Sequence, residues 1–61
     1  MDMTGKELLK LLKKEGWEII RIEGSHHILR KNGKTLVLPV HGNQSVPNGL
    51  LNRLLKDAGI K

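Results

Sequence analysis

The dipeptide Asn32-Gly33 constrains the fold of this chain more than any other feature. It separates two segments, residues 26–31 and 34–40, whose residue types favour strands. Asn-Gly suits the two central positions of a type I′ turn, because both positions need a positive φ angle. Residues 17–22 are also rich in strand-forming types, and Glu23-Gly24 after them supplies a possible tight turn. The sequence therefore predicts a meander of three antiparallel strands.

A two-residue turn at Asn32-Gly33 fixes the register of the second hairpin, and with it the two faces of the sheet. One face pairs Lys31 with Lys34, Leu29 with Leu36 and His27 with Leu38, and the other pairs Arg30 with Thr35, Ile28 with Val37 and His26 with Pro39. The first face is the more apolar and should be covered. Because adjacent strand residues point to opposite faces, we expect His27 to face the cover and His26 to face solvent.

A helix is predicted on each side of the strands. The segment Thr4-Gly5-Lys6-Glu7 has the spacing of a capping box, and leucines follow at helical spacing until Gly16, which suits a left-handed C-cap. In the second helix, Ser45 is the expected N-cap, with Pro47 in the first turn. Its apolar stripe consists of Leu50, Leu51, Leu54, Leu55 and Ala58, followed by Gly59. We therefore expect one α+β domain over residues 1–61, in the order helix, three-stranded antiparallel sheet, helix.

The charge of the chain points to a polyanionic partner. Eleven Lys and Arg against six Asp and Glu give a formal net charge of +5, and the sequence pI is about 10.0. Such an excess favours nucleic acid, although charge alone does not separate RNA from DNA, an acidic protein or a membrane surface. The single aromatic residue, Trp17, argues against a surface of several rings that stacks successive bases.

Composition also bears on location. The chain has no cysteine, so neither a disulfide framework nor a thiolate metal site can support the fold, which fits a reducing compartment. The first residues, Met1-Asp2-Met3-Thr4, lack the basic and apolar segments of a signal peptide. The longest apolar stretch, residues 36–40, is far shorter than the roughly 20 residues that a spanning helix needs. We expect a cytoplasmic protein with no membrane partner.

His26 is the candidate catalytic residue. An imidazole exchanges a proton near neutral pH, and cleavage of RNA without a metal ion requires such exchange, either at the 2′-hydroxyl group or at the leaving 5′-oxygen. Gly24 and Ser25 precede it, where a glycine allows close backbone approach and the amide groups could hold a phosphate. An ordinary surface histidine after a glycine turn fits the same pattern, so both interpretations stay open.

Positive charge is expected around His26, because the phosphorane that develops during cleavage is anionic. The candidates for RNA contact are Arg21, Arg30, Lys31, Lys34 and His41, together with Gly24 and Ser25. Arg30 shares the predicted face of His26, and Arg21 pairs with His26 if Glu23-Gly24 forms the first turn. Lys31 and Lys34 flank the second turn. The same cations, like the lysines of the first helix, could instead serve solubility alone.

Three histidines raise the question of a metal site. Adjacent residues on a strand diverge, cysteine is absent, and neither HxxxH nor CxxC spacing occurs, so we expect no metal and no cofactor. His27 is interpreted as a core histidine with a backbone or water partner. His41 should lie in the loop after the third strand, where it either binds phosphate or caps the loop.

The sequence resembles the HicA-type (YcfA-like) toxins, the mRNA interferase half of a bacterial or archaeal toxin–antitoxin pair. The resemblance runs from Thr4 to Gly59. Its motifs are Lys6-Glu7-Leu8-Leu9-Lys10, Gly16-Trp17, Gly24-Ser25-His26-His27-Ile28, Leu38-Pro39-Val40-His41, Gly49-Leu50-Leu51 and the run from Leu54 to Ile60.

The resemblance implies a fold like that of double-stranded-RNA-binding domains and a catalytic role for His26, the first histidine after Gly-Ser. It also implies metal-independent cleavage of mRNA and neutralisation by a HicB-type antitoxin. The chain departs from the family pattern at Leu50, where threonine is common, and at Asn52, where a basic residue is common.

Two other functions remain as alternatives. One is a non-catalytic module that binds double-stranded RNA through the same basic surface. The other is a protein-interaction module whose basic face docks an acidic partner. Loss of RNA cleavage in His26→Ala, with folding and RNA affinity retained, is expected for the ribonuclease and for neither alternative.

Overall fold

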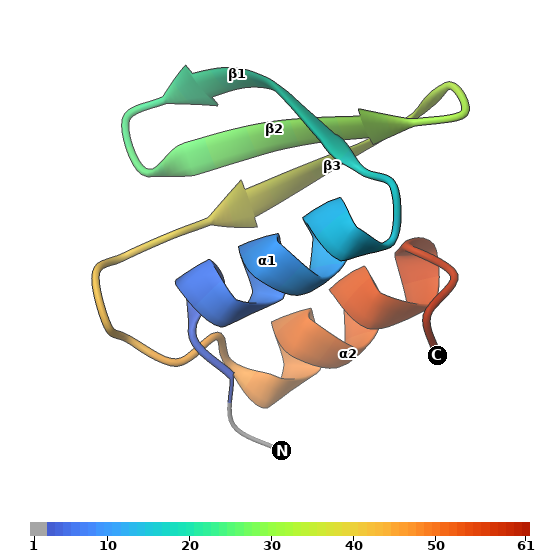
Figure 1. Cartoon of the computed structure of the whole chain (residues 1–61). Coiled ribbons are helices and arrows are strands. Elements are labelled where there is room, and N and C mark those ends of the chain that lie inside the picture. The colour runs from blue at the N-terminus through green and yellow to red at the C-terminus, as the bar shows by residue number, and fades with distance from the viewer. Residues whose placement is uncertain (1–2) are drawn as a thin grey trace.

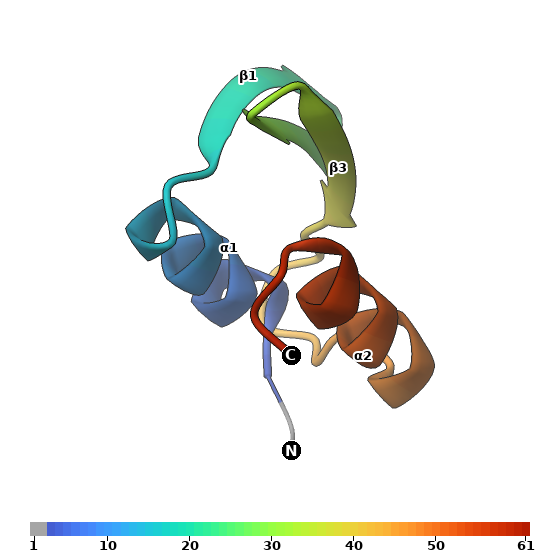
Figure 2. The ribbon, with the colours of Figure 1, turned by 90° about the vertical axis from the view of Figure 1, so that its right-hand side faces the viewer.

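The computed structural model describes residues 3–61. Met1 and Asp2, the first residues of the segment compared above with a signal peptide, lie outside the described residues. The elements are α1 (Gly5–Lys14), β1 (Glu18–Glu23), β2 (His26–Lys31), β3 (Lys34–Pro39) and α2 (Asn48–Asp57). The strands form one antiparallel sheet in the order β1-β2-β3, and both helices lie on one face of it (Figures 1 and 2). The predicted α+β class and element order are confirmed.

The hairpin of β2 and β3 has the predicted register. Asn32 and Gly33 have φ angles of 49° and 82°, as a type I′ turn requires. All six predicted pairs occur, from Lys31 opposite Lys34 to His26 opposite Pro39. Pro39 is the last residue of an edge strand, where its missing N–H group disrupts no ladder.

The turn between β1 and β2 differs from the prediction by one residue. Gly24 and Ser25 form the turn, and Gly24, with a φ angle of 60°, takes the first central position. A type II′ turn needs a positive φ angle at that position alone, so Ser25 keeps an ordinary conformation. Glu23 therefore pairs with His26, and Arg21 pairs with Ile28. The predicted pairing of Arg21 with His26 was wrong.

The core lies between the sheet and the two helices. The capping box at the start of α1 is present, with the Glu7 N–H donating to Thr4 Oγ1 at 3.1 Å and the Thr4 N–H donating to Glu7 Oε1 at 3.0 Å. The five largest fully buried side chains come from both helices, β2 and β3, and they are Leu8, Leu12, Leu29, Leu38 and Leu51. Burying a leucine contributes about 2 kcal/mol, so these contacts hold the helices on the sheet.

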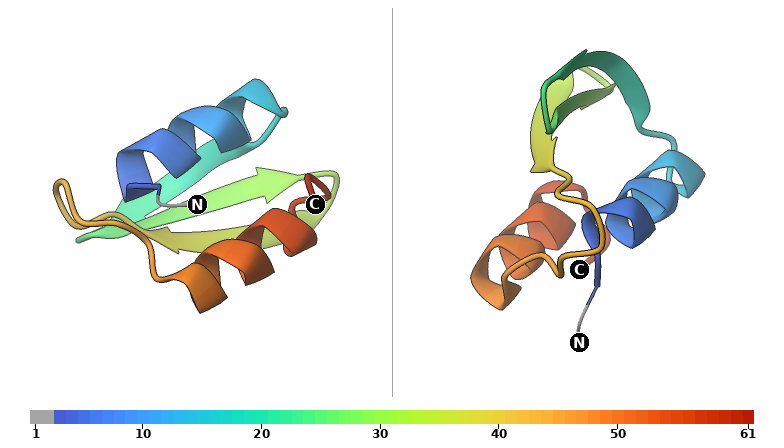
Figure 3. Two further views of the ribbon diagram at one scale, coloured as in Figure 1. Left: turned by 90° about the horizontal axis from the view of Figure 1, so that it is seen from below. Right: turned by 90° about the vertical axis from the view of Figure 1, so that its left-hand side faces the viewer.

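The chain enters α2 differently from the prediction. Ser45 does not cap the helix, because it is paired with Thr4 in an isolated β-bridge, where the Val46 N–H donates to the Met3 carbonyl oxygen at 2.7 Å. Pro47 is the N-cap, with an extended ψ angle of 140°. The expectation for Ser45 was wrong because its backbone is committed to this bridge. Figure 3 shows the resulting loop from β3 to α2 at one end of the paired helices.

The helices are short. Among residues 3–61, no helix has the length and apolar character needed to cross a membrane.

Candidate functional site

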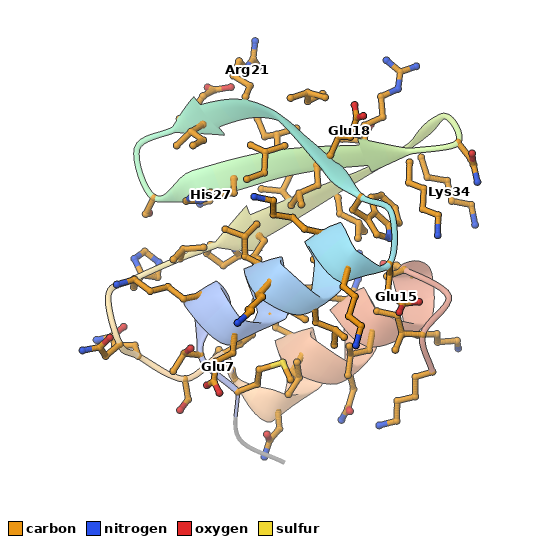
Figure 4. The ribbon with its side chains drawn as sticks, in the orientation of Figure 1. Glu7, Glu15, Glu18, Arg21, His27 and Lys34 are labelled. Carbon is orange, nitrogen blue, oxygen red and sulfur yellow. The ribbon has the colours of Figure 1, made fainter. Side chains whose placement is uncertain are left out.

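The sheet face turned away from the helices is open to solvent and carries His26. We call it the open face, and the register assigns to it Glu18, Arg21 and Glu23 of β1, His26, Ile28 and Arg30 of β2, and Thr35, Val37 and Pro39 of β3. In Figure 4, Arg21 and Glu18 point away from the helices. Val37, at 49% exposure, is among the large apolar side chains that solvent reaches. The open face is therefore a mixed polar and apolar surface on which a partner can lie.

The two adjacent histidines point to opposite faces, as predicted. His26 is exposed, whereas His27 is half-buried and lies on the helix side of β2 (Figure 4). The Nδ1 atom of His27 is 3.4 Å from the Ser25 carbonyl oxygen, which fits the expected backbone or water partner. His27 is only half-buried, however, so the expectation of a core histidine was wrong. His26, rather than His27, is thus the imidazole that a large substrate can reach.

The turn before His26 is anchored and open. The Ser25 carbonyl oxygen accepts a hydrogen bond from the Val40 N–H at 2.8 Å, which joins the turn to the end of β3. A Cβ atom built on Gly24 would meet nothing within 4 Å. Space is therefore available beside the backbone that positions His26.

Two arginines lie on the open face, at different distances from His26. Arg21 is the diagonal neighbour of His26 across β1 and β2. The Cα atoms of such diagonal neighbours lie about 7–8 Å apart. Arg30 is four residues along β2, or about 13 Å away along the strand. Glu18 and Glu23 on the same face balance these two charges. The open face therefore carries little of the positive excess of the chain.

Lys31 and Lys34 lie elsewhere. They pair with each other on the helix side of the sheet, five residues of β2 away from His26. The Lys31 Nζ atom donates a hydrogen bond to the Glu15 carbonyl oxygen at 2.6 Å, and Figure 4 places Lys34 and Glu15 at the same end of the molecule. The structure does not bring these two lysines to His26. The alternation of side chains along a strand predicts this position on the helix side, since Lys31 is on the same face as Leu29.

Much of the remaining positive charge is on the helices. The exposed lysines of α1 are Lys6, Lys10, Lys13 and Lys14. The exposed cations of the C-terminal region are Arg53, Lys56 and Lys61. An RNA bound to the open face would contact these cations only at the edges of that face, because the helices lie on the other side of the sheet.

His41 lies in the loop after β3 and is exposed. It lines a cleft of about 240 Å³ whose walls include Pro39, Val46 and Leu50. Pro39 is also the partner of His26 across β2 and β3, so the cleft adjoins the open face next to His26. The His41 carbonyl oxygen accepts from the Gln44 N–H at 3.0 Å, which closes a turn in the loop.

Glu23 is a residue of this site that the sequence analysis missed. The sequence predicts Glu23 in the first turn, whereas in the structure it is the last residue of β1 and lies opposite His26. Its Oε2 atom is 2.5 Å from Arg21 Nη2, and the two side chains are 55% and 68% exposed. The sequence does contain a signal for the correct turn. A positive φ angle is easier at Gly24 than at Glu23, so Gly24 suits the first central position of the turn and Glu23 suits the end of the strand. Within residues 3–61, no group of three or more His, Cys, Asp and Glu side chains could hold a metal ion.

Residues 5–60 match the model of a family described as the HicA toxin of bacterial toxin–antitoxin systems. The chain belongs to the HicA toxin family. A HicA relative from Pseudomonas fluorescens (strain Pf0-1), described as "probable mRNA interferase HicA", is 36% identical over 59 residues. The match covers 97% of this chain and 98% of the relative. The resemblance found in the motifs is thus confirmed for the family.

Proposed function

We propose that this HicA family member is the toxin of a toxin–antitoxin pair and an endoribonuclease that cleaves mRNA, with His26 transferring a proton without a metal ion. The observation that supports this most is the exposure of His26 on the open face, directly after the Gly24-Ser25 turn. A relative described as a "probable mRNA interferase", matched over nearly the whole chain, supports the same activity.

The chemistry follows from the substrate. RNA carries its own nucleophile in the 2′-hydroxyl group, so cleavage needs proton transfer and stabilisation of negative charge. An imidazole in reach of the scissile phosphate contributes about 10²- to 10⁴-fold by proton transfer. Arg21, diagonal to His26, is the cation best placed to stabilise the developing phosphorane.

RNA affinity requires further contacts. We propose that the open space beside Gly24 and the Ser25 amide receive the phosphate, and that Arg30 and His41 contact the flanking RNA. Lys31 and Lys34 lie on the other side of the sheet, so they would contact RNA only if it wraps around the hairpin tip. A HicB-type antitoxin would neutralise the toxin by covering the open face.

The test is cleavage of mRNA by purified protein in the presence of a metal chelator. Relative to wild type, we expect His26→Ala to lose at least about 100-fold in rate. Its circular dichroism, thermal midpoint and RNA affinity should stay unchanged. The control is Thr35→Ala, an exposed position on the same face, which should cleave as wild type does. In cells, expression of the wild type but not of His26→Ala should arrest growth, and coexpression of the antitoxin should restore it.

Failure of the wild-type protein to cleave RNA, with or without added metal, would rule out the ribonuclease. RNA binding without cleavage would identify the protein as a non-catalytic RNA binder. Cleavage that persists in His26→Ala would remove His26 from the mechanism.

A further inference from the structure

Glu23 faces His26 across the first hairpin. The two residues flank the Gly24-Ser25 turn and are direct partners in the register of β1 and β2. Side chains of such partners start about 4.5–5.5 Å apart and on the same face of the sheet. A two-residue loop is the shortest that joins antiparallel strands, so it leaves this separation little freedom. The backbone therefore places Glu23 and His26 side by side on the open face.

Cleavage of RNA by its own 2′-hydroxyl group needs two proton transfers. A base removes the 2′-hydroxyl proton, and an acid protonates the 5′-oxygen that leaves. Few neighbours of His26 can act as the second group, since β3 presents Thr35, Val37 and Pro39 to this face, and these do not exchange protons. His41, in the loop beyond Pro39, is the rival candidate that the experiment below tests. The guanidinium groups of Arg21 and Arg30 are hydrogen-bond donors only and cannot serve as a base. Glu18 is at the other end of β1, opposite Arg30.

Glu23 also has a partner that makes it compatible with RNA. A lone carboxylate would repel a phosphate group, but Arg21 Nη2 is 2.5 Å from Glu23 Oε2 and offsets that charge. Both side chains remain more than half exposed, so the second carboxylate oxygen can reach a substrate.

Building on the proposed ribonuclease function, we propose that Glu23 is the general base and His26 the general acid of RNA cleavage. A carboxylate at neutral pH accepts a proton and has none to give, which assigns the base. Glu23 takes the 2′-hydroxyl proton while the 2′-oxygen attacks phosphorus. The bond between phosphorus and the 5′-oxygen breaks, and the His26 imidazolium gives its proton to that oxygen. The products are a 2′,3′-cyclic phosphate and a 5′-hydroxyl group, and solvent returns both side chains to their starting states.

The experiment compares Glu23→Gln with Glu18→Gln in the full chain. Both changes remove one carboxylate from the same strand and the same face, and only Glu23 faces His26. We expect Glu23→Gln to lower kcat/KM by about 10²- to 10⁴-fold, and Glu18→Gln to leave it within about twofold. Thermal melting of both variants reports the fold. The substrate is a labelled RNA oligonucleotide that the wild type cleaves, with a copy carrying a 2′-deoxyribose at the cleaved position.

The pH profile separates a proton acceptor from a positioning residue. Wild-type kcat/KM should fall at low pH, where the base is protonated, and at high pH, where the acid has lost its proton. In Glu23→Gln, the fall at low pH should disappear and the fall at high pH should remain. The wild-type product should end in a 2′,3′-cyclic phosphate, and the 2′-deoxy substrate should stay intact.

Wild-type rates in Glu23→Gln overturn the proposal, as does a slower variant that keeps the fall at low pH. In both cases the ribonuclease function stands, provided that His26→Ala is inactive. If the fall at low pH is lost in His41→Ala and kept in Glu23→Gln, the base is His41. If the wild type cleaves no RNA, the proposed function itself fails and this inference fails with it.

Discussion

The Lys31 side chain donates a hydrogen bond to the main-chain carbonyl oxygen of Glu15 at a distance of 2.6 Å. Lys31 ends β2, and Glu15 is the C-cap of α1, so the bond joins the hairpin to the carboxyl end of a helix. Carbonyl groups there lack helical partners and carry partial negative charge. Lys31 thus satisfies one of these groups and holds the sheet against α1.

Lys31→Met should therefore destabilise the fold. We expect a loss of about 1 kcal/mol, because the bond is charge-assisted but solvent reaches it. For a domain of this size, that corresponds to a fall of roughly 4–8 °C in the thermal midpoint. Lys34→Met is the matched control, since Lys34 is the partner of Lys31 on β3 and is exposed. Equal melting temperatures of the two variants, measured by circular dichroism, would contradict the role given to this bond.

The capping box makes the stability of α1 dependent on pH. Hydrogen bonds with Thr4 hold the pKa of the Glu7 carboxyl below its usual value. The backbone N–H of Thr4 has the larger effect and its hydroxyl group the smaller one. A carboxyl whose pKa is lower in the folded state stabilises the fold above its unfolded-state pKa. That contribution is lost as the pH falls through the folded-state pKa. Acid should therefore weaken the start of α1.

Glu7→Gln separates the charge from the hydrogen bond, because glutamine still serves in a capping box. The difference in thermal midpoint between wild type and Glu7→Gln should be largest near neutral pH and shrink in acid. Thr4→Ala removes the acceptor for the Glu7 N–H and should cost about 1 kcal/mol. Glu18→Gln, outside this helix, serves as the comparison. A gap between wild type and Glu7→Gln that does not change with pH would contradict the assignment.

Most of the fold could be predicted because local signals agreed with each other. Asn32-Gly33 requires one turn type, that turn sets the register, and the register places Leu29 and Leu36 under the helices. Family membership followed from motifs that lie on these elements. The catalytic role of His26 stays a prediction, since exposure of a side chain does not by itself establish chemistry.

What could not be predicted depended on contacts between distant segments. Ser45 looks like a helix cap, but Thr4, about 40 residues earlier, occupies its backbone in a β-bridge. The bulge in β1, which adds a residue between Ile19 and Arg21, has no strong local signal in the sequence. The predicted first turn is one residue too early, so the prediction places Glu23 in the turn and not opposite His26. A side chain central to the proposed chemistry was missed for this reason.

Gly5 is a position where intrinsic helix preference and packing predict opposite effects. It is the first residue of α1 and is buried against the end of β3. Alanine is normally the better helix former by about 1 kcal/mol. Here a Cβ atom would lie 3.0 Å from Val40 Cα and 3.1 Å from the Pro39 carbonyl oxygen. Both are backbone atoms, so neither can rotate away.

Gly5→Ala should therefore destabilise the protein by about 1–3 kcal/mol, as overpacking does elsewhere. Gly49→Ala is the matched control, because Gly49 lies in the first turn of α2 and a Cβ atom there meets nothing within 4 Å. That variant should gain about 0.4–1 kcal/mol. Urea denaturation of both variants measures the difference. Stabilisation by both substitutions would show that α1 can move away from β3 at little cost, and that the end of β3, which carries the partner of His26, is not held by this contact.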